Sequence, residues 1–236
     1  MKAYYDVAQG SADWFELRKG IPTASEFDKI ITPVTGKLSK SATRYAYRLI
    51  AERLLNCPLE TMEGQQWMER GQELEPLAVK HLEYVYEVET VPVGFITSDD
   101  GSLGCSPDRL VKGRPEGVEI KCPSPQVHLG YLLDGHPVEY RPQVQGQMLV
   151  AELDHVIFES YHPRMPAKLI VTDRDEAYIA LMRAALAGFN DLLLSMLERA
   201  KALGVFQAYE EAVTPLEVER AGELSAELLD RVGIPP

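Results

Sequence analysis

The sequence predicts one domain of mixed structure (α/β, or α+β), in which a central mixed β-sheet is flanked by helices. Short apolar runs bounded by turn residues alternate with segments of helical periodicity. At 236 residues, 45% of them hydrophobic and 25% charged, the chain is long enough for one sizeable core. We expect the domain to cover residues 1–206, followed by an acidic tail of helical character at 207–236, whose role the sequence does not indicate.

The first elements are helical. Residues 13–27 predict a short helix that ends near Gly20, followed by a second helix capped by Thr23 or Ser25. Arg18 lies at the end of the first of these helices, where a basic side chain ordinarily complements the helix dipole.

A second helical segment, 39–55, carries a basic row formed by Lys40, Arg44 and Arg48 at every fourth position. A solvated face explains such a row, but three cations without interleaved acids also suit the backbone of a DNA duplex. Both interpretations remain open from the sequence.

A third helix is predicted within 61–86, and Pro76 lies either in its first turn or at a kink. Glu75 precedes this proline. Most glutamates at such a place are exposed, although an inward carboxylate there could approach the sheet.

Residues 91–97, a turn at 98–101, a return strand at 103–108 and a hairpin ending at Cys122 predict a three-stranded antiparallel core. In the last strand Glu119 and Lys121 share one face, because successive side chains point to opposite sides. The hairpin turn brings Asp108 back beside Glu119. An amphipathic strand with a solvated face is the ordinary interpretation, but two carboxylates and one ammonium also suit magnesium and a phosphate.

The remaining elements complete the mixed sheet. Residues 140–152 predict a helix that enters at Pro142 and places its glutamines at the surface. Strand-like runs follow at 155–161 and 168–172, and Asp173 is expected to cap a long helix that runs to about residue 203. His128 and His136 have no metal-ligand spacing, so we assign them no metal.

Charge and cysteine content bear on partners and compartment. The net charge of −12 is an objection to nucleic-acid binding, but residues 25–53 hold six basic and three acidic residues, a local charge of +3. Residues 207–236 hold seven acidic and two basic residues, a local charge of −5. Three cysteines without a CxxC pair, no secretory pattern and no apolar run of membrane-spanning length predict a cytoplasmic protein with no membrane partner.

The pattern of Pro-Asp, ten residues and Glu-x-Lys at 107–121 resembles the motif of the PD-(D/E)xK nuclease superfamily. Further segments extend the likeness in the same order along the chain: WFELRKGIPTASEF, GQELEPLA, CSPDRL, VEIKCP, PQVQGQM and YHPRM. Over about residues 10–205 the chain therefore resembles the phage-lambda-type exonucleases, also called YqaJ-like viral recombinase nucleases. The resemblance implies a restriction-endonuclease-like core.

The resemblance also implies roles for individual residues. Glu75, Asp108, Glu119 and the Ile120 carbonyl would bind Mg²⁺, as two ions for which Mn²⁺ can substitute. Lys121 and Gln143 would act at the scissile phosphate and the attacking water. The implied 5′-phosphate pocket comprises Arg18, Ser25 and Ser106, and Met68 matches an apolar wedge that splays the terminal base pair.

One departure from the family pattern concerns this pocket. Relatives can carry an additional arginine shortly after VEIKCP, where this chain has Gln126, Val127 and His128. The sequence leaves open how strongly this pocket binds phosphate. It also leaves open whether His128 compensates for the missing basic residue.

The implied activity is Mg²⁺-dependent 5′-to-3′ exonuclease digestion of linear double-stranded DNA. It would run processively to mononucleotides and leave a 3′ single strand for recombination by annealing. The family further implies a homotrimeric ring, a single-strand annealing partner, and a phage- or prophage-encoded enzyme in a bacterial host. Two alternatives remain: a site-specific or structure-specific endonuclease on the same fold, and a non-catalytic DNA-binding recombination adaptor.

Overall fold

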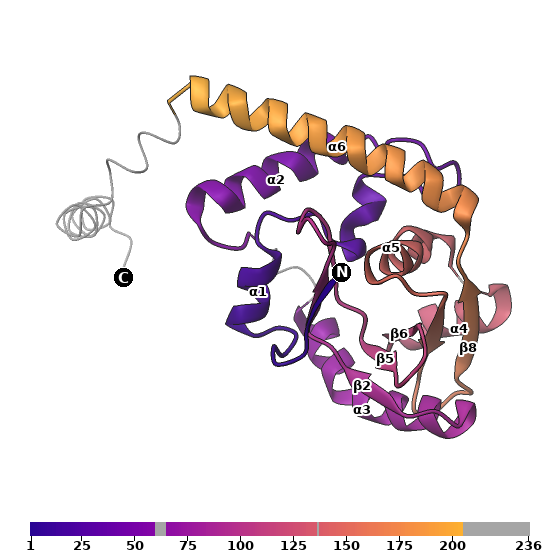
Figure 1. Cartoon of the computed structure of the whole chain (residues 1–236). Coiled ribbons are helices and arrows are strands. Elements are labelled where there is room, and N and C mark those ends of the chain that lie inside the picture. Colours follow the sequence, from indigo (N-terminus) through magenta and orange to yellow (C-terminus); the bar gives the residue numbers. More distant parts are fainter. Residues whose placement is uncertain (60–64, 136, 205–236) are drawn as a thin grey trace, which may run out of the picture. The chain divides into compact units, whose positions relative to one another are not determined.

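The computed structural model describes residues 1–59, 65–135 and 137–204, excepting the side chains of residues 65–70 and 72 (Figure 1). The predicted tail at 207–236, His136 and the side chain of Met68 therefore lie outside the described residues. The fold and the site belong to the first of two compact units, Met1–Asp191, and the second begins at Leu192.

The larger sheet has five strands in the order β2-β5-β6-β7-β8. Its members are β2 (Thr90–Pro92), β5 (Arg109–Val111), β6 (Glu116–Lys121), β7 (His155–Ser160) and β8 (Lys168–Asp173). β6 and β7 pair in parallel, whereas the other neighbours pair antiparallel. The predicted mixed sheet is therefore confirmed.

A smaller sheet contains β1 (Lys2–Tyr4), β3 (Phe95–Thr97) and β4 (Gly104–Cys105), in the order β1-β3-β4. The expected continuous three-stranded antiparallel core is thus wrong, because residues 91–97 divide between two sheets. Pro92 has no N–H to continue the ladder, and a side chain on Gly94 would lie 1.9 Å from the Val7 carbonyl oxygen. The chain leaves the larger sheet at this point.

The N-terminal helices lie close to the predicted positions. They are α1 (Ala12–Arg18), the 3₁₀ helix η1 (Ala24–Lys29), α2 (Ala42–Leu55) and α3 (Gln65–Tyr86). Because α2 begins at Ala42, Lys40 falls outside it, and the basic row on the helix is shorter than expected. Pro76 lies in the interior of α3, which excludes the first turn, one of the two positions expected for it.

The C-terminal helices are α4 (Pro125–Asp134), the 3₁₀ turn η2 (Val138–Tyr140), α5 (Arg141–Ala151) and α6 (Glu176–Ala202). The cap of α6 is Asp175, whose Oδ1 accepts a hydrogen bond from the Tyr178 N–H at 3.0 Å. The expectation that Asp173 caps α6 is wrong, because this residue ends β8.

The two faces of β6 meet different helices (Figure 1). Val118 and Ile120 pack in one cluster with Ala78 and Leu82 of α3. Glu119 points to the opposite face and hydrogen-bonds side chains of α5. The period-2 pattern of this strand therefore sorts its apolar and charged residues as predicted.

Among the described helices, α6 is long and apolar enough to cross a membrane, with a mean hydropathy of 1.4 over its best 18-residue window. A single helix of this kind is a weak indication of a membrane span, because the core helix of a globular protein meets the same criterion.

Candidate active site

Asp108 stands immediately before β5 and is tied to the strand that follows it in the hairpin. Its N–H donates to the Val118 carbonyl at 3.0 Å, and its Oδ2 accepts from the Ile120 N–H at 2.5 Å. The hairpin therefore brings Asp108 and Glu119 together as predicted.

Glu119 is a buried carboxylate, with 2% of its surface exposed. Its Oε1 contacts Lys121 Nζ at 2.5 Å and accepts a hydrogen bond from Gln143 Nε2 at 2.6 Å. Its Oε2 accepts from Gln147 Nε2 at 2.5 Å. A charge removed from water requires such partners, and three donors satisfy this one.

Lys121 lies beside Glu119 with its ammonium 5.2 Å from the centre of the Tyr140 ring. Burial favours the neutral amine, but the charges of Glu119 and Asp108 outweigh burial and raise the pKa of Lys121 above its usual range. Lys121 is consequently an ammonium at neutral pH. An ammonium at this position can stabilise negative charge or donate a proton.

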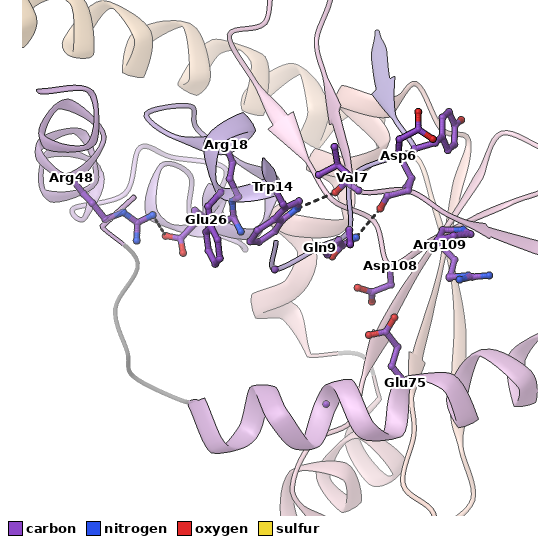
Figure 2. A pocket seen from close by; sticks show the side chains of 18 residues that line it. Asp6, Val7, Gln9, Trp14, Arg18, Glu26, Arg48, Glu75, Asp108 and Arg109 are labelled. Atoms are coloured by element: carbon purple, nitrogen blue, oxygen red, sulfur yellow. Dashed lines mark hydrogen bonds and ion pairs between the residues drawn. The ribbon is translucent and has the colours of Figure 1, made fainter. Parts of the chain in front are cut away.

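Asp108 and Glu75 complete a group of acids. Burial, followed by the charge of Glu119, raises the pKa of Asp108 well above its usual range. Burial also raises the pKa of Glu75, which lies on α3; the charge of Arg109 opposes the increase and that of Glu119 adds to it. Figure 2 shows the carboxylates of Asp108 and Glu75 facing each other. These carboxylates repel one another, so their environment favours a cation.

The donor set fits a hard divalent cation. Glu75, Asp108 and Glu119 offer only oxygen, and the Ile120 carbonyl belongs to the residue between Glu119 and Lys121 of β6. No three acidic, histidine or cysteine side chains within the described part of the chain form a ready-made metal cluster, however. The oxygens of Glu119 instead contact donors from Lys121, Gln143 and Gln147.

A cavity of about 820 Å³ connects this acidic group with α1 (Figure 2). Asp108 and Glu75 line it together with Trp14 and Arg18. The guanidinium carbon of Arg18 lies 3.9 Å from the centre of the Trp14 ring, so the cation is held against an aromatic face. Arg18 consequently shares one cavity with Asp108 and Glu75, whereas the buried Glu119 is not among the residues that line it.

The predicted 5′-phosphate residues are linked through Trp14 and Thr23, which the sequence did not associate with phosphate binding. Trp14 Nε1 donates to Ser106 Oγ at 2.9 Å. Thr23 Oγ1 accepts from Arg18 Nη2 at 3.4 Å and lies 3.2 Å from Ser25 Oγ. The fold thus brings Arg18, Ser25 and Ser106 into one polar cluster.

Arg48 lines the same cavity, but acids surround it. Its Nη2 lies 3.1 Å from Glu26 and its Nε 3.6 Å from Glu52. The description of the basic row as free of interleaved acids is therefore wrong for Arg48, because η1 supplies Glu26 and the next turn of α2 supplies Glu52. Arg44 is exposed.

His128 is fully buried and does not face the cavity residues. Its Nδ1 lies 2.7 Å from Ser160 Oγ and its Nε2 lies 3.0 Å from the Pro166 carbonyl oxygen. With both ring nitrogens engaged, His128 cannot replace the arginine that relatives place near this position.

Sequence reasoning missed Gln147 as a partner of Glu119, and the expectation that the glutamines of α5 lie at the surface is wrong. Gln145 and Gln147 are 2% and 1% exposed, because α5 is packed between the larger sheet and η1. Spacing could have indicated two of the missed residues. Gln147 follows Gln143, and Arg18 follows Trp14, by four positions, which places each pair on one helix face.

Comparisons with known proteins identify the family of this chain. The family model for the YqaJ-like viral recombinase domain matches residues 13–175. The alkaline exonuclease LHK-Exo from Laribacter hongkongensis has 29% identity and a TM-score of 0.73, and its complex with dAMP has 30% and 0.74. Each comparison covers 82% of this chain and 98% of the other.

A phage-related exonuclease from Haemophilus somnus 129PT shares the fold, with 16% identity and a TM-score of 0.58 over 75% of this chain and 96% of its own. We found no match among curated protein sequences. The family model and the relatives at 29–30% identity carry the assignment: the chain belongs to the YqaJ-like viral recombinase domain family and is a nuclease of that family.

Proposed function

We propose that the protein is a Mg²⁺-dependent exonuclease that digests one strand of linear double-stranded DNA processively from its 5′ end. The products are mononucleotides and a 3′ single-stranded overhang for recombination by strand annealing. The observation that carries this proposal is the shared cavity, which Arg18 lines together with Asp108 and Glu75. In this cavity Arg18 would bind the end of a DNA strand close to the catalytic carboxylates, so cleavage would remove nucleotides from that end.

Arg18 is the residue that receives the 5′-phosphate. A guanidinium binds phosphate through paired, charge-assisted hydrogen bonds, and its stacking on Trp14 orients that fork. Ser25 and Ser106 provide further hydroxyl donors beside it. Preference for a 5′-phosphorylated end follows, because a hydroxyl end offers no charge to this group.

Hydrolysis takes place by in-line attack of water on the scissile phosphate, without a covalent intermediate. Glu75, Asp108, Glu119 and the Ile120 carbonyl would hold Mg²⁺, as two ions for which Mn²⁺ can substitute. When bound, the ions would supply Lewis-acid chemistry that activates water and offsets negative charge at the phosphate. Lys121 contributes its positive charge at the phosphate, and Gln143 orients Glu119 by the hydrogen bond at 2.6 Å.

Release of mononucleotides draws support from the relative LHK-Exo, whose complex contains dAMP. A nucleoside monophosphate is the chemical class of product that stepwise cleavage from a 5′ end releases. Arg44 and Arg48 contact the duplex backbone in this proposal, and Met68 splays the terminal base pair.

The proposal extends to the assembly of the enzyme and its cellular setting, which the resemblance to the family implies. The proposed enzyme is a homotrimeric ring that encloses DNA, works with a single-strand annealing protein, and acts in the cytoplasm of a bacterial host as a phage or prophage product. Enclosure accounts for processivity, because a ring around a duplex does not dissociate between cuts. Analytical ultracentrifugation tests the ring, with a trimer mass as the expected result.

Linear and covalently closed circular duplexes, incubated with Mg²⁺ and then with EDTA, test the reaction itself. We expect loss of the linear duplex only, early release of label from the 5′ end, and no reaction in EDTA. Cutting of the closed circle would instead identify an endonuclease. Binding without cutting would identify an adaptor, although an adaptor has no need of the set formed by Asp108, Glu119 and Lys121.

A further inference from the structure

Two glutamines of α5 contact the two oxygens of one carboxylate. Gln143 Nε2 donates to Glu119 Oε1 at 2.6 Å, and Gln147 Nε2 donates to Oε2 at 2.5 Å. The residues are four positions apart, so they stand one above the other on the helix face that looks toward β6. Together they hold the carboxylate from both of its oxygens.

The other side of α5 is anchored independently. Gln145 Nε2 donates to the Asp173 carbonyl at 2.8 Å, and Gln145 Oε1 accepts from the Asp175 N–H at 2.9 Å. Arg174 Nη1 donates to the Met148 carbonyl at 2.6 Å near the end of the helix. The helix is thereby fixed to the segment after β8, so Gln147 presents its amide from a rigid support.

The orientation of the Gln147 amide is determined by its hydrogen bond. Its Oε1 is buried and has no hydrogen-bond partner in the described part of the chain. Turning the amide over would place that oxygen against Glu119 Oε2, with two acceptors in contact. The protein therefore leaves an acceptor unsatisfied, an unfavourable state for a buried polar atom, and keeps the N–H on Glu119.

We propose that Gln147 is a positioning residue that fixes the plane of the Glu119 carboxylate for divalent-cation binding. The inference rests on the proposed metal-dependent cleavage. Lys121 and Gln143 share Oε1, whereas the hydrogen bond at Oε2 comes from Gln147 among the residues that the structure describes. An ionised carboxylate oxygen has more than one lone pair, so Oε2 accepts this hydrogen bond and still offers a site to a cation. Without Gln147 the Glu119 carboxylate is freer to rotate about its Cγ–Cδ bond, so the cation is bound by a less ordered ligand.

Direct titration with Mn²⁺, monitored by the electron paramagnetic resonance signal of the free ion and without DNA, tests this role in the full-length protein. Gln147→Met keeps the length and apolar volume of the side chain but removes the donor. We expect Mn²⁺ affinity to fall by about 10- to 100-fold, the usual effect of losing a group that orients a metal ligand. Gln145→Met is the matched control, because this buried glutamine of the same helix does not contact Glu119. Arg174 still anchors α5 at the Met148 carbonyl in this variant, so it should lower thermal stability and leave Mn²⁺ affinity close to wild type.

Gln147→Asn retains an amide one methylene shorter, which cannot reach Glu119 in the same way, and it replaces Gln147→Met if that variant does not fold. Wild-type affinity in either folded Gln147 variant, or an equal loss in Gln145→Met, would overturn the inference while the proposed function stands. A wild-type protein that binds no Mn²⁺ would overturn both.

Discussion

Replacement of Lys121 by methionine tests the electrostatics of the site most directly, because the change removes a charge and retains an apolar chain of similar length. The ammonium lies 2.5 Å from Glu119 Oε1. At that separation two unit charges attract by about 7 kcal/mol at an effective dielectric constant of about 20. The cost of removing both ions from water offsets part of this attraction, and breaking a buried pair ordinarily destabilises a protein by about 3 to 5 kcal/mol. Gln143 and Gln147 still donate to Glu119 in the variant. We therefore expect its free energy of unfolding to fall by about 3 kcal/mol, the lower end of this range.

The penalty should depend on pH. Lys121 lowers the pKa of Asp108, which burial and Glu119 otherwise raise, so Lys121→Met raises the pKa of Asp108 further. A group with a raised folded-state pKa contributes stability that is present below its ordinary value of 3.8 and is lost as pH rises through the folded-state value. The destabilisation should therefore be larger at pH 8 than at pH 5.

Urea unfolding in EDTA at both pH values measures the penalty. Lys112→Met is the control, because Lys112 forms an exposed pair with Glu89 at 2.8 Å and should cost about 0 to 1 kcal/mol. Cleavage of linear duplex by folded Lys121→Met should fall by at least about 100-fold. Turnover close to wild type would refute the catalytic role, and a penalty no larger than that of Lys112→Met would refute the buried-charge reasoning.

Three further variants test other parts of the molecule. Arg18→Ala should lose about 1.5 to 3 kcal/mol of the preference for 5′-phosphorylated over 5′-hydroxyl ends, measured as a ratio of degradation rates. Some metal-dependent cleavage should remain. An unchanged ratio would mean that Arg18 only complements the dipole of its helix. Arg44→Gln should reduce the salt dependence of duplex binding by about one unit of slope, and an identical slope assigns Arg44 to solvated surface. Gly146→Ala should destabilise the fold by about 1 to 3 kcal/mol, because its Cβ would lie 2.5 Å from Phe27. Gly130→Ala, with open space around it, should not destabilise in the same urea assay.

The sequence alone determined features that depend on local periodicity and chain connectivity. Alternation along 118–121 separates Val118 and Ile120 from Glu119 and Lys121, whatever the rest of the chain does. A short hairpin then pairs the segment that begins at Asp108 with the strand that contains Glu119. The two residues therefore lie close together. The helices and the mixed sheet also occur near their predicted positions, because local periodicity determines them.

Only the tertiary structure decided which polar groups are buried and which partners they meet. Gln147 is buried because α5 is packed between the sheet and η1, and a pattern of glutamines does not reveal what covers them. Arg48 meets Glu26 across 22 positions of sequence, so the charge of its own helix could not predict that pair. Residues 91–97 divide between two sheets, and at the division the Val7 carbonyl oxygen occupies the space that a side chain on Gly94 would need. Each of these outcomes depends on contacts between segments that are distant in the sequence. The local pattern of one segment does not show which other segment will pack against it.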